Sequence, residues 1–171
     1  SLCAVVSISY APMTVGKELE AWRPGLLDIH HINTGRGDAA YFIFPDGTEM
    51  IFDVGDLAVR SLVSHPILRV ADPRPDNSKT PAVWISEYIR SVRPQLKSLE
   101  LDYAIVSHFD SDHYGNAQVR RKRSSSGNFV LTGLAELGDL IPIRTLIDRA
   151  GPDYSIPVEL TGRDATLDNY L

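Results

Sequence analysis

The sequence predicts a mixed α/β (α+β) domain, because stretches with strand character alternate with stretches of helical periodicity along the chain. The length of 171 residues suits one domain, residues 1–171, with a sizeable core. Apolar residues make up 43% and charged residues 23%, which excludes a disordered or coiled-coil protein. The net charge of -5 argues against a nucleic-acid binder held by global charge, and no apolar run suits a membrane span.

Three strands are expected in the first third of the chain. They are residues 26–33 (LLDIHHIN), 39–44 (AAYFIF) and 49–54 (EMIFDV), and a Pro-Asp-Gly-Thr turn predicts that the last two form a hairpin. Their nearly continuous apolar runs favour strands that are buried on both faces. The adjacent His30 and His31 should point to opposite faces of the first strand, so they cannot chelate one ion together.

The later elements follow from turn composition and periodicity. Residues 64–80 are rich in Pro, Asp, Asn and Ser and predict a loop. Helical spacing of apolar residues predicts a helix over 79–92 that Pro94 ends. The remaining expected elements are a strand at 101–107, a helix at 130–140, a strand at 144–147 and an N-capped helical start at 164–171.

Four side chains of metal-ligand type lie within six residues after the strand at 101–107, namely His108, Asp110, Asp112 and His113. Imidazole and carboxylate donors suit zinc, and also manganese or iron. Two half-sites about 3.5–4 Å apart would hold a bridging water and lower its pKa toward neutrality. The alternative is a polar loop in which the aspartates cap turns and the histidines bond to backbone. The density of ligand types behind a buried strand favours the metal site.

The segment 108–113 (HFDSDH) resembles the HxHxDH signature of the metallo-β-lactamase-fold hydrolases, with Asp110 in place of the middle histidine. Residues 29–39 (IHHINTGRGDA) resemble the VHFLDVGQGDA segment of the ComEC-like branch of that superfamily, and residues 51–56 (IFDVGD) resemble its ILIDAGD strand end. The resemblance covers about residues 26–115. It implies an αββα sandwich and a metal-dependent hydrolase.

The resemblance also implies a role for each matching residue. Metal one would be bound by His108 and Asp110, and metal two by Asp112 and His113. Asp112 would lie against the attacking water and act as the catalytic residue. Asp53 would support the metal loop from behind the ligands, and Asp38 would brace the same region. The implied cofactor is zinc, two ions, with manganese or iron admitted because carboxylate is a harder ligand than imidazole.

A basic run follows the metal motif at residues 120–127 (RRKRSSSG). Its functional reading is that Arg120, Arg121 and Arg123 catch the phosphates of a substrate, and the alternative is a solvated loop. Tyr114 is a candidate substrate contact or a packing residue. This run and the ComEC-like resemblance favour a phosphodiesterase or nuclease. The open alternatives are a β-lactam or thioester hydrolase, and a non-catalytic protein of this fold that binds a ligand or partner.

The histidines are unevenly placed, since all five lie at or before His113. The resemblance implies further metal ligands after the motif, including later histidines. We therefore expect an N-terminal half of a larger domain, truncated at its C-terminus, whose site a missing half or a partner chain completes. The single cysteine, Cys3, excludes an internal disulfide and leaves the compartment unassigned, with a soluble, cytoplasmic location slightly favoured.

Overall fold

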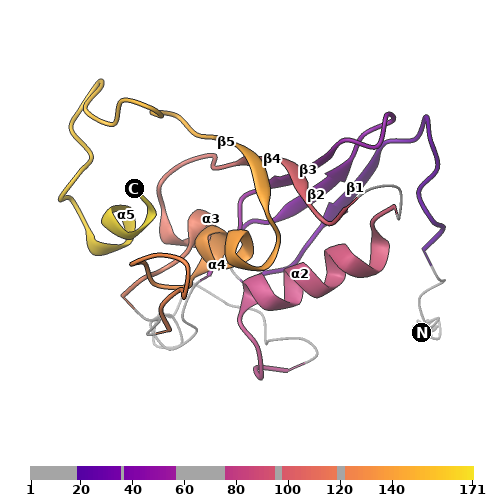
Figure 1. The fold of residues 1–171 in the computed structure, drawn as a ribbon, viewed down its shortest axis with the longest axis horizontal. Helices are drawn as coiled ribbons and strands as arrows, with labels where there is room; N and C mark the ends of the chain where they lie inside the picture. Colours follow the sequence, from indigo (N-terminus) through magenta and orange to yellow (C-terminus); the bar gives the residue numbers. More distant parts are fainter. Residues whose placement is uncertain (1–18, 36, 57–75, 95–97, 119–121) are drawn as a thin grey trace, which may run out of the picture.

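Five strands form one mixed sheet in the computed structural model, which describes residues 19–35, 37–56, 76–94, 98–118 and 122–171 (Figure 1). Their order is β1-β2-β3-β4-β5; β1 to β3 pair antiparallel, and β3 to β5 pair parallel. The strands are β1 (Asp28–His31), β2 (Ala40–Ile43), β3 (Glu49–Phe52), β4 (Leu101–Ile105) and β5 (Ile143–Ile147). A mixed sheet with helices confirms the α+β class.

Four helices complete the described part of the chain: α2 (Pro81–Val92), α3 (Ser111–Tyr114), α4 (Gly133–Leu140) and α5 (Ala165–Tyr170). Three correspond to predicted helices. Their starts lie one to three residues inside the predicted starts, and their ends lie within one residue of the predicted ends. The one-turn helix α3 was not predicted. The start of α2 follows from local chemistry, because the Thr80 hydroxyl accepts from the Val83 amide and Pro81 fits the first turn.

The predicted hairpin joins β2 to β3, with Ala40 opposite Phe52 and Ile43 opposite Glu49. Gly47 in its turn has a φ of 84°, a left-handed conformation that glycine adopts without a steric penalty. Of the predicted loop at 64–80, residues 64–75 lie outside the described residues, and residues 77–79 form bends ahead of α2.

Helices α2 and α4 lie on the same side of the sheet, as Figure 1 shows, and they enclose the core. Ile85 and Ile89 of α2 and Leu137 of α4 are fully buried there. Burial of each such side chain contributes about 1.5–3 kcal/mol. The sheet side of the core is formed by Tyr41, Ile43, Ile51, Leu101 and Ala104.

A buried ion pair anchors the end of α2 to the sheet. Arg93 donates to both carboxylate oxygens of Glu49, at 2.8 and 3.1 Å, and the Tyr41 hydroxyl donates to Glu49 Oε2 at 2.5 Å. Burial and this hydrogen bond raise the pKa of the Tyr41 hydroxyl. Loss of one partner would leave a buried charge uncompensated, so the three side chains stabilise the hairpin only together.

The opposite face of the sheet is apolar, and no described helix covers it (Figure 1). Phe42 and Met50 on this face are half-buried, and Tyr103 and Ile147 are 40% and 43% exposed. A shallow hollow of about 610 Å³ lies there, lined in part by Met50, Tyr103 and Ile147. The prediction that the early strands are buried on both faces is therefore wrong. Their apolar runs reflect one face packed on helices and a second apolar face without a cover among the described elements.

Strand β1 shows the same difference between faces at one pair of residues. His30 is half-buried, and its Nδ1 lies 2.9 Å from the Tyr88 hydroxyl, whereas His31 is exposed. The expected opposite orientation of the two histidines is confirmed. Burial lowers the pKa of His30 and outweighs the opposing charge of Asp28.

The sheet topology brings the sequence motifs to one edge. Strands β3 and β4 are parallel, so their carboxyl ends meet at the same edge, with Phe52 beside Ile105. The antiparallel β2 starts at that edge, because Ala40 pairs with Phe52. Residues before β2 and residues after β3 and β4 are thereby brought together. None of the described helices is long and apolar enough to cross a membrane.

Candidate metal centre

Two motif glycines, Gly37 and Gly55, allow the segments before β2, after β3 and after β4 to close around the carbonyl oxygen of Asp112. A Cβ placed on Gly37 would lie 2.3 Å from this oxygen, and one placed on Gly55 would lie 2.0 Å from it. Both distances are far below van der Waals contact, so only glycine fits at either position. The role of these glycines is close backbone approach.

Backbone hydrogen bonds complete this junction. The Asp38 amide donates to the Asp112 carbonyl at 3.0 Å, and the Val54 amide donates to the His113 carbonyl at 2.7 Å. The Gly55 amide donates to the Asp38 carbonyl at 3.1 Å. Helix α3, which carries Asp112 and His113, is thus held against the segments before β2 and after β3.

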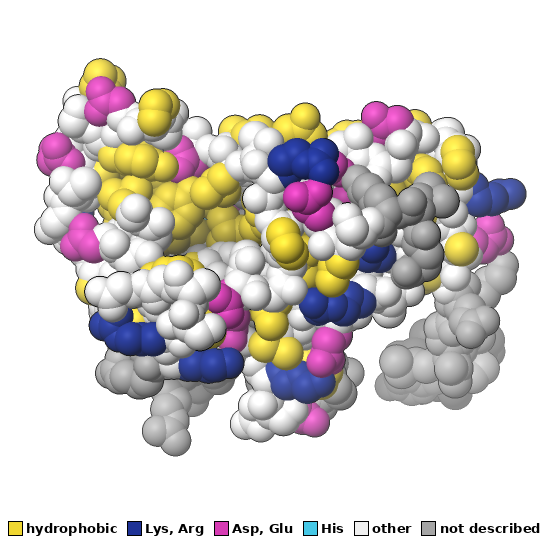
Figure 2. Space-filling model, in the orientation of Figure 1, with side chains coloured by type: hydrophobic (Ala, Val, Ile, Leu, Met, Phe, Trp, Pro, Cys, Tyr) yellow, Lys and Arg dark blue, Asp and Glu magenta, His cyan; other side chains and the backbone are white. Residues whose placement is uncertain are grey.

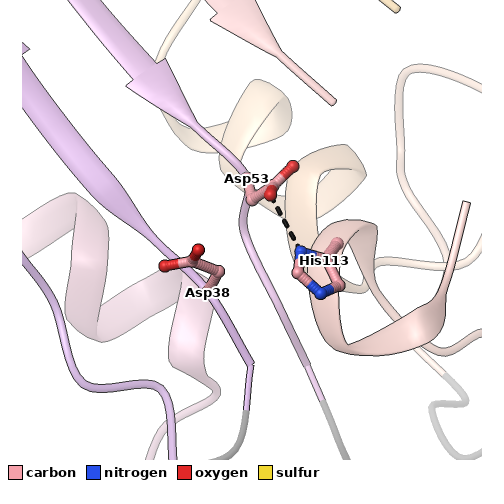
Figure 3. Close-up of side chains that lie close together, drawn as sticks. All are labelled: Asp38, Asp53 and His113. Atoms are coloured by element: carbon pink, nitrogen blue, oxygen red, sulfur yellow. Dashed lines mark hydrogen bonds and ion pairs between the residues drawn. The ribbon is translucent and has the colours of Figure 1, made fainter. Parts of the chain in front are cut away.

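Asp53 is the central buried carboxylate of the site. It follows β3 with a φ of 57°, a left-handed conformation that aspartate tolerates better than most residues. Its Oδ1 accepts from the Ser107 amide at 2.8 Å, and its Oδ2 accepts from the Ser107 hydroxyl at 2.6 Å. Asp53 Oδ2 also lies 2.9 Å from His113 Nδ1 (Figure 3). The carboxylate therefore joins the end of β4 to α3.

Asp53 determines which nitrogen of His113 is available to a ligand. Because a carboxylate only accepts hydrogen bonds, the proton of the neutral imidazole lies on Nδ1, and the Nε2 lone pair is free. His113 Nε2 lies 3.9 Å from Asp112 Oδ1. A carboxylate behind a ligating histidine is a usual arrangement at metal sites.

The predicted ligands form two neighbouring pairs. His108 Nε2 lies 3.4 Å from Asp110 Oδ2, and the rings of His108 and His113 have centroids 3.8 Å apart. The His108 and Asp110 side chains are 45% and 74% exposed, whereas that of His113 is 19% exposed and that of Asp53 is fully buried. These contacts place His108 beside Asp110 and His113 beside Asp112, and they also place the two imidazoles next to each other. The division of the four side chains between two ions stays a prediction.

A tighter group of metal-ligand atoms is formed by Asp38, Asp53 and His113, whose ligand atoms lie within 4.8 Å of one another (Figure 3). No other group of three such residues meets this distance in the described part of the chain. An ion in this group would compete with the hydrogen bonds that Asp53 already accepts. Since Asp53 is fully buried, its hydrogen-bonding role behind His113 is the better fit.

Tyr114, a candidate substrate contact, lies in the core and is 3% exposed. Its ring contacts Phe109 and Tyr170 edge-on. Burial raises the pKa of its hydroxyl most, and the charges of nearby aspartates raise it further. This placement favours packing over substrate contact. Figure 2 shows hydrophobic side chains gathered between the C-terminal segment and the rest of the molecule.

Asp148 serves the same aromatic cluster and is not available as a metal ligand. It accepts from the Ala150 and Gly151 amides and from the hydroxyls of Tyr154 and Tyr170, at 2.6–2.9 Å. Burial raises the pKa of Asp148, but these hydrogen bonds outweigh it, so the pKa is lowered overall. The side chain is committed to the aromatic cluster.

The basic run is described only in part, because Arg120 and Arg121 lie outside the described residues. Arg123 is exposed, and its Nη1 donates to the Asn128 side chain at 2.7 Å and to the Asn128 carbonyl at 3.3 Å. Arg123 is thus engaged within its own loop.

Comparison of the chain with models of known protein families, with curated proteins and with solved structures finds no match.

Sequence reasoning did not single out Ser107 or the buried pair Asp56 and Thr132. The Thr132 hydroxyl donates to Asp56 Oδ2 at 3.0 Å and accepts from the Asn116 amide at 2.8 Å, which links the end of β3 to the segment after α3. The one available signal for Ser107 was its position directly before His108 at a strand end. Its partner Asp53 is distant in sequence, so the contact could not be predicted.

Proposed function

We propose that this chain is a metal-dependent hydrolase with a metallo-β-lactamase-like site, using metal-activated water. The observation that carries the proposal is the buried Asp53 behind His113. It leaves Nε2 of His113 free beside Asp112, at the edge where a second histidine and aspartate also lie. A structural salt link would not require a second imidazole and two further carboxylates at the same loop.

The donor set fits zinc, and the carboxylates admit manganese or iron. His108 with Asp110 and Asp112 with His113 would each hold one ion. When bound, two ions lower the pKa of a shared water and polarise the scissile bond. Asp112 is the proposed catalytic residue, because its half-buried carboxylate lies beside His113 and can orient the attacking water.

The favoured substrate class is a phosphodiester, in a small molecule or a nucleic acid. The support is the basic run after the metal motif, which contains Arg123. The loop of this run is held close to α4 by the hydrogen bond from the Ser124 hydroxyl to Asp139 at 2.6 Å. Hydrolysis of a β-lactam or thioester is an alternative within the same chemistry. A non-catalytic protein that binds a ligand or partner is the alternative of another class.

We also propose that the sheet is one of the two central layers of an αββα sandwich. The apolar face of the sheet that no described element covers supports it, because a large exposed apolar patch marks a surface on which another element packs. A second sheet, from a further segment or a partner chain, would cover this face and supply further metal ligands. Strong binding of an apolar dye to the 171-residue chain, lost on addition of the covering element, would support this arrangement.

Metal stoichiometry and turnover test the function together. Elemental analysis and calorimetric titration with zinc and manganese should show at least one ion per chain, reduced by His113→Ala. His31→Ala is the matched control, since His31 is an exposed histidine on the first strand. Hydrolysis of bis-p-nitrophenyl phosphate, compared with a neutral ester, assigns the substrate class.

The metal content and the turnover together distinguish a hydrolase from a non-catalytic binding protein. Less than one ion per chain with no turnover would overturn the hydrolase proposal. Metal binding without turnover of either substrate would favour the non-catalytic alternative.

A further inference from the structure

Ser107 lies between Asp53 and both candidate ligand histidines. Its Oγ is 2.6 Å from Asp53 Oδ2, 3.0 Å from His108 Nδ1 and 3.4 Å from His113 Nδ1. The proposed hydrolase mechanism does not use this hydroxyl. The hydroxyl has one proton, which it can donate to only one of these three polar groups.

Counting protons assigns the direction of each hydrogen bond. A carboxylate can only accept, so the Ser107 hydroxyl donates to Asp53 across the short 2.6 Å contact. The oxygen of Ser107 is then an acceptor toward His108 at 3.0 Å, which favours the proton of neutral His108 on Nδ1. The competing acceptor is Asp110 Oδ2, which lies farther away, 3.4 Å from Nε2, on a side chain that is 74% exposed.

We propose that Ser107 is a positioning residue that transmits the effect of Asp53 to His108, an inference that rests on the proposed metal site. Asp53 selects the tautomer of His113 by direct contact and that of His108 through the Ser107 hydroxyl. One buried carboxylate thereby directs the Nε2 atoms of both histidines to the ligand. Histidine in water favours the opposite tautomer, with the proton on Nε2, so the hydroxyl works against the intrinsic preference.

The test is the histidine tautomer in the metal-free chain, measured by nitrogen-15 NMR at about pH 9, well above the ordinary imidazole pKa of about 6.5. In the wild-type chain both His108 and His113 should carry the proton on Nδ1. In Ser107→Ala, His108 should shift toward the Nε2-protonated form while His113 stays unchanged. Ser107→Thr keeps a hydroxyl and should restore the wild-type tautomer.

The Ser107→Ala chain should fold, because the backbone hydrogen bond from residue 107 to Asp53 Oδ1 does not depend on the side chain. Zinc affinity should also fall, by roughly three- to tenfold, less than the 10–100-fold typical for groups behind ligands because Ser107 is exposed. An unchanged His108 tautomer in Ser107→Ala would overturn the inference. Absence of metal binding by the wild-type chain would instead overturn the proposed function, which the metal-free NMR result does not depend on.

Discussion

The two halves of the candidate site differ in how firmly the fold holds them. The inner half, Asp112 with His113, has its backbone clasped by the two glycine segments and its imidazole held by a buried carboxylate. The outer half, His108 with Asp110, is largely exposed, and its imidazole is held through Ser107. The fold has thus ordered one half before any ligand arrives.

The two halves should also differ in their affinity for metal ions. Ordering a side chain costs conformational free energy, which the inner half has already lost on folding and the outer half still has to lose. We therefore expect a first ion to bind at Asp112 and His113, and a second to bind more weakly at His108 and Asp110. Local rigidity, rather than ligand chemistry, would set this order, because both pairs contain one imidazole and one carboxylate.

The strongest way to break the inner half is Gly55→Ala. The added Cβ would lie 2.0 Å from the Asp112 carbonyl, so backbone must move, and we expect a loss of about 3 kcal/mol in unfolding free energy. Chemical denaturation measures it. Gly138→Ala in α4 is the control, because its Cβ would meet Ile143 at an ordinary 3.6 Å. Equal stability of both variants would refute the proposed clasp.

A change of smaller effect is Asp53→Asn, which keeps the shape of the side chain and removes its charge. The amide has one acceptor oxygen, so it cannot accept both from the Ser107 amide at the Oδ1 position and from the Ser107 hydroxyl and His113 at the Oδ2 position. We therefore expect a loss of about 2 kcal/mol in unfolding free energy. Metal affinity should fall by roughly 10–100-fold. Denaturation and calorimetry provide the two values. The exposed turn variant Asp46→Asn should match the wild-type chain, and an Asp53→Asn chain that binds zinc normally would exclude the role assigned to Asp53.

Local signals predicted most of the fold and only part of the site. The hairpin turn and the Asp164 cap, which accepts from two amides of α5, depend on neighbouring residues and were predicted from the sequence. Helix α3 has a single turn and no periodicity to detect. The place of Asp53 behind the metal loop was expected only from the family resemblance. Its individual contacts and the glycine clasp join residues far apart in the chain, so local signals do not reveal them, and they depend on the parallel pairing of β3 and β4.

The sheet face that no described element covers shows what an apolar sequence pattern cannot predict. Continuous apolar runs predicted strands covered on both sides, and the residues themselves are apolar on both sides. Apolar composition reports what a face can pack against, not whether the cover belongs to the described elements. The same pattern therefore predicted the strands of the sheet correctly and their burial on both faces wrongly.

The smallest expected difference between the inner and outer halves is in stability, and it is tested by comparing His108→Ala with His113→Ala. His108 is exposed, so its removal should change the unfolding free energy by no more than about 0.5 kcal/mol. Removal of His113 leaves the buried Asp53 without one of its partners, which should cost about 1–2 kcal/mol. Denaturation of the two variants side by side measures both effects.

Metal titration of the same pair then separates the two halves. His108→Ala should retain one tightly bound ion, since Asp112 and His113 are untouched, whereas His113→Ala should lose the tight site. If both variants lost the same amount of stability and the same ion, the two halves would form one cooperative unit. Because the inner ring is anchored directly and the outer ring through a single exposed hydroxyl, the geometry favours the unequal outcome.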